Sequence, residues 1–483
     1  MTAGGLIVRG AAASAGGLVL RLGARLLFLV VAGQLYGAAL FGAYSLAVAS
    51  VELAVAIGGL GMKRLIFQHL DERGERPDTH VLADVVLLVA AVGALLAGAV
   101  MLAMAVLPEA LISPNTAYAL LVLAPLIVAQ ALLDVLLAAT RWKHLIRYEV
   151  AGRSLVEPYA AVAAAAAAWY AGFEAGGLLI GYWCGTLAAL AFALVGIARA
   201  YPLSPLRAYR PGRRRAFAML RGAAATTAAD GLSALFLRLD LYLVGMLLGE
   251  RPAGVYGMAR QLAMPIRQVR QSFDGLLAPM VAKTLQTSGL EATGRAVASA
   301  ARLILALQIP MLIALVAIGQ PLLHWLGPEF SAGWLAAVLL ACAEAVQGAF
   351  GIGELLFIYR RPRLGLGIMA ATALLGLAAG LAFTLAWGLD GAAAAVLVTY
   401  AVRAWTRRLA LKAGLGVGVA LLHSSGPILA GLAGGAAAAI VVGFEGGAGW
   451  PLALAAGLLV YLVLLLGWMR VSGQTLALQH FRA

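Results

Sequence analysis

The sequence has few charged residues and almost no cysteine. Only 12% of its 483 residues are charged and 63% are apolar, whereas soluble domains average about 25% and roughly 45–50%. The two cysteines, Cys184 and Cys342, lie inside apolar runs and form neither a disulfide framework nor a zinc-binding spacing. An apolar excess this large excludes a water-soluble core and indicates an integral membrane protein.

The sequence also lacks the short motifs of several enzyme classes. No Gly-Lys dipeptide occurs, which excludes the Walker loop of a P-loop ATPase. There is no H-E-x-x-H and, despite 58 glycines, no G-x-G-x-x-G, and the six histidines form no close-spaced ligand pair. Nothing positions a base beside a Ser or Cys nucleophile. We therefore expect no catalytic residue, no metal site and no cofactor, and transport by conformational change is the favoured class.

Apolar runs of about 17–25 residues, the length that spans a bilayer as a helix, recur along the whole chain. A spanning β-barrel would instead show alternating segments of roughly 10 residues. The sequence therefore predicts an all-α polytopic membrane protein with about fourteen spans, near 14–35, 42–62, 81–107, 117–140, 154–172, 177–198, 217–248, 254–280, 300–324, 333–358, 364–387, 391–413, 424–444 and 450–470.

The basic residues between these runs are very unevenly distributed. One set of alternate loops, together with both chain ends, carries 28 Lys and Arg residues, and the opposite loops carry only Arg251. The positive-inside rule places the basic side, and so both termini, in the cytoplasm. The net charge of +14 is thereby explained by loops beside a bilayer, so nucleic-acid binding is a minor alternative and we expect no nucleic-acid partner.

Six arginines fall inside the predicted spans, where each would cost roughly 2.5–3.5 kcal/mol if it faced lipid. A buried arginine is compatible with a structural ion pair or with snorkelling to the interface. Because guanidinium suits bidentate capture of phosphate oxygens, a shared cavity for an anionic substrate accounts for the whole set more simply. We predict that the following residues bind the anionic headgroup: Arg21, Arg25, Arg238, Arg260, Arg267 and Arg270.

Acidic residues also occur within the predicted spans. Each is open to two interpretations, neutralisation of a neighbouring arginine or transfer of a coupling proton or cation. Helical spacing places Arg260, Arg267 and Asp274 on one stripe. The acidic residues open to both interpretations are Glu52, Asp134, Asp230, Asp240, Asp274, Glu344 and Glu354. Asp84 and Glu157, which lie near the starts of two spans, are better explained by a favourable helix-dipole contact.

A short internal repeat indicates two similar halves. The pattern G-x8-G-x-Y occurs at Gly33, Gly42 and Tyr44 and again 212 residues later, ending in Gly254 and Tyr256. Both copies lie at the turn between an odd and an even span, as expected for a parallel repeat of six plus six helices. We predict an N-terminal lobe at 1–210 with helices 1 to 6, a C-terminal lobe at 211–415 with helices 7 to 12, and two appended helices with a cytosolic tail at 416–483.

The sequence resembles a known transporter family in four places. These are the opening helix with its two arginines and the following three segments, G33QLYGAALFGAYSLAVASVELAVAIGGLGMKR64, R238LDLYLVGMLLGERPAGVYGMARQL262 and W387GLDGAAAAVLVTYAV402. It is similar to the polysaccharide-repeat flippases, which move lipid-linked oligosaccharides and form part of the multidrug/oligosaccharidyl-lipid/polysaccharide exporter superfamily. The resemblance extends over essentially the whole chain as a 12+2 helix architecture.

This resemblance implies a flippase rather than an enzyme. It would move an undecaprenyl-pyrophosphate-linked glycan across the bacterial cytoplasmic (inner) membrane by alternating access, for lipopolysaccharide or exopolysaccharide synthesis. The arginines would contact the pyrophosphate or anionic sugars, and the lipid tail would stay in the bilayer, against a groove formed with helices 13 and 14. Coupling to H⁺ or Na⁺ is common in related proteins, and Asp134, Asp240 and Asp274 are the candidates here. Membrane lipids, a polysaccharide polymerase and export machinery are the implied partners.

Three alternatives stay open at this stage. A lipid II flippase would share the architecture, but Glu52 in the second helix, which has no arginine, counts against that substrate. A drug/cation antiporter of the same superfamily would have twelve helices and an acidic or aromatic cavity. A scaffold or channel-like protein would need neither the repeat nor the charges inside the spans.

Overall fold

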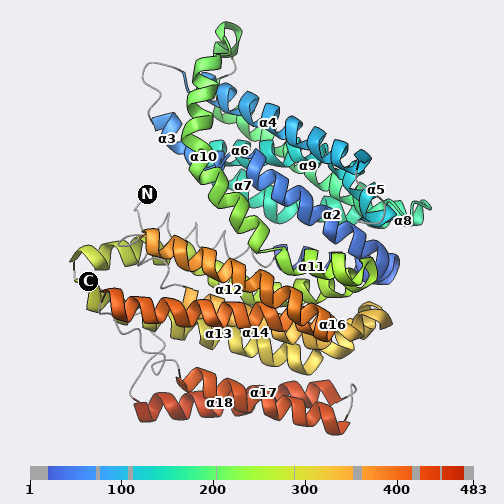
Figure 1. Cartoon of the computed structure of the whole chain (residues 1–483), viewed down its shortest axis with the longest axis vertical. Coiled ribbons are helices and arrows are strands. Elements are labelled where there is room, and N and C mark those ends of the chain that lie inside the picture. The colour runs from blue at the N-terminus through green and yellow to red at the C-terminus, as the bar shows by residue number, and fades with distance from the viewer. Residues whose placement is uncertain are drawn as a thin grey trace. The chain divides into compact units, whose positions relative to one another are not determined.

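The chain is helical throughout the part that the computed structural model describes. That part comprises residues 20–71, 77–106, 112–202, 204–287, 289–351, 362–415, 425–445 and 449–472. It contains no β-strand, and the described residues of each predicted span lie in helices or helical segments (Figure 1). The prediction of an all-α fold is confirmed.

The helices divide into two compact units. Unit 1 covers Met1–Arg238 and Gly249–Gly254, and unit 2 covers Leu239–Leu248 and Val255–Ala483. In unit 1, residues 20–31 are helical and are followed by η1 (Ala32–Tyr36), α2 (Gly37–Gly58), α3 (Met62–Asp71), α4 (Asp78–Val106), α5 (Pro114–Leu123), α6 (Leu126–Trp142), α7 (Ile146–Ala151), η2 (Gly152–Val156), α8 (Glu157–Tyr170), α9 (Gly177–Ala200), η3 (Ser204–Ala208) and α10 (Arg213–Phe236).

Unit 2 is formed by fewer and longer helices. They are α11 (Leu239–Leu248), α12 (Glu250–Thr287), whose first residues belong to unit 1, α13 (Gly289–Leu326), η4 (Pro328–Gly333), α14 (Trp334–Phe350), α16 (Pro362–Leu415), α17 (Ser425–Glu445) and α18 (Trp450–Ser472). The predicted division into lobes at residue 210 is a different boundary, and it stays a prediction.

Eight of the described helices are long and apolar enough to cross a membrane, or up to ten if each of two bent helix pairs is one span. One bent pair is α5 and α6, which meet at an angle of 47° at Pro125, where a proline disrupts helical hydrogen bonding. Two of the eight stretches, Leu20–Asp71 and Gly367–Ala413, each contain two of the predicted spans. The number fourteen therefore stays a prediction, whereas the multi-pass character is confirmed.

Glycines with positive φ mark the breaks inside both long stretches. Gly37 has φ 72° at the start of α2, and Gly388 has φ 60° inside α16, directly after the non-helical Trp387. Glycine adopts this region of φ without the steric penalty of a Cβ atom. The two positions lie where the sequence predicts the turns between helices 1 and 2 and between helices 11 and 12.

The segment between the predicted spans 42–62 and 81–107, which is expected to be a basic loop, begins with the helix α3. Its residues Met62, Ile66 and Leu70 are buried, while Lys63 and Arg64 are exposed. Apolar residues four apart form one face of a helix, so this segment has one face in the core of unit 1 and a basic face outside it. The prediction of a simple loop was wrong because the count of basic residues carries no information on helical periodicity.

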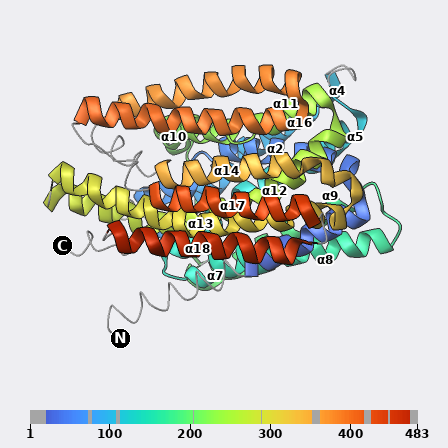
Figure 2. The ribbon, with the colours of Figure 1, turned by 90° about the horizontal axis from the view of Figure 1, so that it is seen from below.

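The last two helices pack against α13 within unit 2. Figure 1 and Figure 2 both show α17 and α18 side by side. Gly434 and Gly457 lie where these two helices approach closely, and a Cβ atom at either position would contact Ile313 of α13. Tyr461 of α18 is buried and donates a hydrogen bond to the carbonyl oxygen of Ala306 at 3.0 Å. The appended pair is therefore an integral part of the unit 2 core.

Candidate functional site

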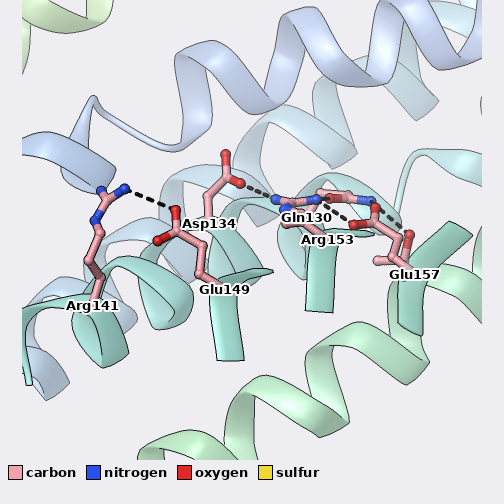
Figure 3. A network of polar contacts seen from close by, with 7 residues as sticks. Gln130, Asp134, Arg141, Glu149, Arg153 and Glu157 are labelled. Carbon is pink, nitrogen blue, oxygen red and sulfur yellow. Dashed lines mark hydrogen bonds and ion pairs between the residues drawn. The ribbon is translucent and has the colours of Figure 1, made fainter. Parts of the chain in front are cut away.

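A network of charged and polar side chains lies inside unit 1 (Figure 3). Arg153 of η2 forms an ion pair with Asp134 of α6, and its Nη1 atom donates to Glu157 Oε2 of α8 at 2.8 Å. Gln130 Nε2 donates to Glu157 Oε1 at 3.0 Å and to Thr186 Oγ1 of α9 at 2.8 Å. We call these five residues the Arg153 network, and it joins α6, η2, α8 and α9.

The π-helical turn η2 positions Arg153 for both carboxylates. A π-helix adds a residue to one helical turn, which changes the direction of the side chains within it. Arg153 and Glu157 are four residues apart and pair along the helix axis, while Asp134 approaches from α6. These side chains are only 20–29% exposed, so removal of one partner leaves a half-buried charge without compensation.

A second ion pair lies beside the Arg153 network. Arg141 at the end of α6 donates to Glu149 Oε1 of α7 at 2.9 Å (Figure 3). Burial raises the pKa of the Glu149 carboxyl, and the neighbouring arginines, Arg141 foremost, oppose that rise. This pair therefore secures α7 to α6 at the edge of the network.

The first two predicted arginines lie on the helix that opens unit 1. Arg21 is exposed, and its Nη2 atom donates to Ser154 Oγ of η2 at 3.2 Å, one residue from Arg153. Arg25 is half-buried one helical turn further along. The structure thus brings Arg21 beside the Arg153 network.

Two more ion pairs of unit 1 join the α2–α3 segment to α10. Arg238, which follows α10, pairs with Glu52 of α2, and Arg64 of α3 pairs with Asp230 of α10. The Arg238 side chain is only 22% exposed, whereas that of Arg64 is 60% exposed. Two carboxylates singled out in the sequence, Glu52 and Asp230, are therefore bound to arginines.

Unit 2 holds a second group of arginine–carboxylate pairs. Asp240 of α11 accepts a bond from the Tyr256 hydroxyl at 2.8 Å and pairs with Arg260 of α12. Arg267, two turns further along α12, binds Glu344 of α14 through two nitrogens, with Nε donating to Oε2 at 2.9 Å. This fork-to-fork geometry is the strongest form of an arginine–carboxylate contact.

The other predicted residues of unit 2 lie further along α12. A Cβ atom placed on Gly351 would lie 3.1 Å from Arg270 Nη1, so this arginine is beside the end of α14. Asp274 is in α12 but its side chain falls outside the described part of the structure, and Glu354 lies outside the described residues.

The predicted headgroup residues thus fall into two sets, one in each unit. Arg21, Arg25 and Arg238 belong to unit 1, and the remaining three, Arg260, Arg267 and Arg270, belong to unit 2. That both sets face one cavity, and that Asp134, Asp240 and Asp274 couple an ion, stay predictions. Among the described residues, no group of three or more His, Cys, Asp or Glu side chains is arranged to hold a metal ion.

The predicted spans 117–140 and 154–172 leave Arg153 in the basic loop between them and place Glu157 near the start of a helix, where a helix-dipole contact is expected. In the structure both belong to the Arg153 network. Their i, i+4 spacing was the available signal for a pair. The contact with Asp134 depends on how α6 packs on η2, which no local pattern in the sequence encodes.

Sequence reasoning also missed a carboxylate that caps a helix from a distant segment. Glu250, the first residue of α12, accepts bonds from the backbone N of Thr116 at 2.8 Å, from Thr116 Oγ1 at 2.8 Å and from Asn115 Nδ2 at 3.0 Å, and it also contacts Ser113. The first turn of α5 has unpaired N–H groups and a positive dipole end, which favour an anion. Burial acts to raise the pKa of Glu250, but these donors outweigh it and hold the pKa below its ordinary value.

The glycines of the internal repeat meet within unit 1. A Cβ atom on Gly42 of α2 would clash with the backbone of Glu250, and one on Gly254 would clash with the backbone of Ala38. The two equivalent positions of the repeat therefore form one close backbone contact, which only glycine at both positions permits.

Comparison with known proteins decides the family. The family model described as "Polysaccharide biosynthesis protein" matches residues 34–360. The chain belongs to the polysaccharide biosynthesis protein family. The family resemblance drawn from the sequence is confirmed. No curated protein sequence matches the chain.

Comparison with solved structures shows which fold this family member has. The lipid II flippase MurJ in an inward closed conformation is 12% identical and has a TM-score of 0.76, over 97% of this chain and 100% of that chain. An inward-facing MATE-family multidrug resistance transporter of the MOP superfamily is 14% identical with a TM-score of 0.65, over 82% and 98% of the two chains. A MOP-superfamily transporter from Pyrococcus furiosus reaches 0.53 at 12% identity, over 83% and 94%. The chain thus has the fold of MOP-superfamily transporters.

Proposed function

We propose that this chain is a flippase for undecaprenyl-pyrophosphate-linked oligosaccharide repeat units. It moves them across the bacterial cytoplasmic membrane by alternating access, and the products enter cell-surface polysaccharide or exopolysaccharide synthesis. The family assignment supports a role in polysaccharide biosynthesis, and the fold it shares with known transporters supports movement across a membrane. The residues that we assign to the headgroup are the six arginines of the two sets.

The observation that carries the proposal is the pairing of arginines with carboxylates in and beside apolar helices. Of the six assigned arginines, Arg238, Arg260 and Arg267 each bind a carboxylate. A phosphate group offers a guanidinium the same fork of oxygen atoms as a carboxylate does. A pyrophosphate can therefore replace a carboxylate at these arginines without leaving a guanidinium unpaired, which makes entry of an anionic headgroup energetically feasible.

The same exchange provides a role for the carboxylates. When Arg260 turns from Asp240 to a pyrophosphate, the carboxylate is left without its positive partner. A carboxylate in an apolar environment then favours uptake of a proton or a cation such as Na⁺. We propose Asp134, Asp240 and Asp274 as the residues that couple H⁺ or Na⁺ to transport.

The direct test measures flipping in proteoliposomes. A labelled undecaprenyl-pyrophosphate oligosaccharide is placed in one leaflet, and its arrival in the other leaflet is followed with a membrane-impermeant glycan-modifying enzyme. The Arg21→Ala/Arg25→Ala double variant should slow arrival by about ten-fold or more, because two guanidinium contacts to the headgroup are lost. Arg295→Ala is the matched control, since its pair with Glu291 is exposed.

The outcomes separate the proposal from its alternatives. Equal flipping by the double variant and the wild type, at equal incorporation, would contradict the role of Arg21 and Arg25. Flipping of lipid II in preference to other lipid-linked glycans would identify a lipid II flippase. Efflux of a cationic dye, without movement of any lipid-linked glycan, would identify a drug/cation antiporter.

The location and orientation belong to the same proposal. We place both termini in the cytoplasm because of the distribution of basic residues, and we propose a polysaccharide polymerase and export machinery as partners that receive the product. Reporter fusions at both ends test the orientation, and a periplasmic signal from either end would contradict it.

A further inference from the structure

An apolar groove of about 570 Å³ runs between the C-terminal half of α2 and α10, within unit 1. Leu53 and Ile57 line its α2 side, and Ala224, Ala228 and Leu232 line its α10 side. The one lining residue with a polar side chain is Thr227, whose hydroxyl is already paired because it donates to the Ala223 carbonyl at 2.9 Å. The groove is therefore suited to a hydrocarbon ligand, and its volume is typical of small-molecule sites.

The shape of the groove comes from small residues on one wall and large residues around them. Ala224, Ala228 and Gly231 recess the α10 surface, and a Cβ atom on Gly231 would already lie 3.1 Å from Ile57 Cγ1. Ile57 and Leu232 are 36% and 43% exposed. Partly exposed apolar side chains around a recess are a binding surface for an apolar partner.

Ion pairs lie beside the groove at two points. Glu52, which pairs with Arg238, directly precedes the lining residue Leu53. Asp230, which pairs with Arg64, directly precedes the lining residue Gly231. The segments that form the apolar walls therefore also carry two arginine–carboxylate pairs, a combination that suits an occupant with a hydrocarbon chain and an anionic group at its end.

We propose that this groove holds the isoprene units nearest the pyrophosphate of the lipid-linked substrate, while the pyrophosphate binds Arg238 in place of Glu52. This inference rests on the proposed function and adds the position of the lipid chain. Charge complementarity selects an anionic headgroup at Arg238, and the apolar lining selects the chain directly attached to it. The distal part of the chain stays in the bilayer.

Photocrosslinking tests the position directly. The probe is an undecaprenyl pyrophosphate with a diazirine on the isoprene unit nearest the pyrophosphate, added to the full chain in nanodiscs of phosphatidylethanolamine and phosphatidylglycerol. Mass spectrometry should locate the adducts on α2 and α10. Ala228→Phe fills the recess and should reduce labelling of these two helices by about ten-fold or more, whereas Ala229→Phe, an exposed alanine of α10 outside the groove, should not.

The possible labelling results distinguish the groove proposal from the proposed flippase function. A diazirine-labelled phosphatidylglycerol serves as the comparison probe. If it labels the groove equally, and unlabelled undecaprenyl pyrophosphate does not displace it, the groove is a site for bulk lipid and the proposal is overturned. Adducts confined to other helices such as α17 and α18, with flipping intact, would overturn the groove assignment and leave the flippase function standing. Absence of adducts anywhere in the chain, together with absence of flipping, would contradict the proposed function itself. The wild-type adduct map does not depend on how well any variant folds.

Discussion

Arg153 is the residue on which the polar interior of unit 1 depends most. Its guanidinium lies between Asp134 and Glu157, so removal of the positive charge leaves two carboxylates close together among apolar helices. Arg153→Gln should therefore lower the free energy of unfolding by about 1–3 kcal/mol, because its partners are half-buried and lose their charged donor. Thermal unfolding of the full chain in detergent measures the loss.

The matched control is Arg295→Gln. The Arg295–Glu291 pair has the same i, i+4 relation along a helix, but its side chains are 59% and 88% exposed, so its loss should change stability by at most about 0.5 kcal/mol. Equal stability of the two variants would show that the Arg153 network contributes no more than a surface pair.

Glu250 makes stability depend on pH at the start of α5. Because the folded carboxyl has a pKa below its ordinary value of 4.5, the unfolded chain takes up the proton first as the pH falls. The stabilisation is therefore complete above about pH 4.5 and is lost as the pH falls through the folded pKa.

Glu250→Gln should remove this contribution. The wild type should exceed the variant by about 1 kcal/mol at pH 7, as expected for a helix cap, and the difference should shrink towards pH 3. Unfolding midpoints of both proteins across this pH range give the measurement. A difference that grows on acidification would contradict the assigned role of the carboxylate.

At the scale of the element, the close contact between α2 and the first turn of α12 depends on two glycines. Gly42→Ala introduces a Cβ atom against the backbone of Glu250. Backbone atoms cannot move aside by a change of rotamer, so we expect the overpacking to lower the free energy of unfolding by about 1–3 kcal/mol. Gly98→Ala is the control, because the space around Gly98 in α4 is open and alanine should stabilise that helix by up to about 1 kcal/mol. Thermal unfolding should shift in opposite directions, and a shift in the same direction would contradict the packing described here.

The long apolar helices and the breaks near Gly37 and Gly388 could be predicted from the sequence, because apolar length and glycine-containing turns are local properties. The contacts of the site could not be predicted to the same degree. Spacing along one helix suggests the Arg153–Glu157 pair, but Asp134 and Glu250 reach partners on other segments through tertiary packing. The amphipathic α3 was missed because its residues were treated as charges in a loop rather than as a helical face.

At the scale of the whole molecule, two units with internal arginine–carboxylate pairs fit a transporter in which charged groups change partners as the substrate passes. Such exchange requires a substrate that carries its own anionic oxygens. We therefore predict selectivity for the chemical class of the cargo: a lipid-linked pyrophosphate should move and a soluble cation should not.

The most direct measurement compares these two cargoes in proteoliposomes that contain only the wild-type protein. One arm follows an undecaprenyl-pyrophosphate oligosaccharide between leaflets, the other follows a cationic dye across the membrane, and protein-free liposomes give the background for both. We predict protein-dependent movement of the lipid-linked oligosaccharide and background movement of the dye. Movement of the dye without movement of the lipid-linked oligosaccharide would contradict the proposed flippase function.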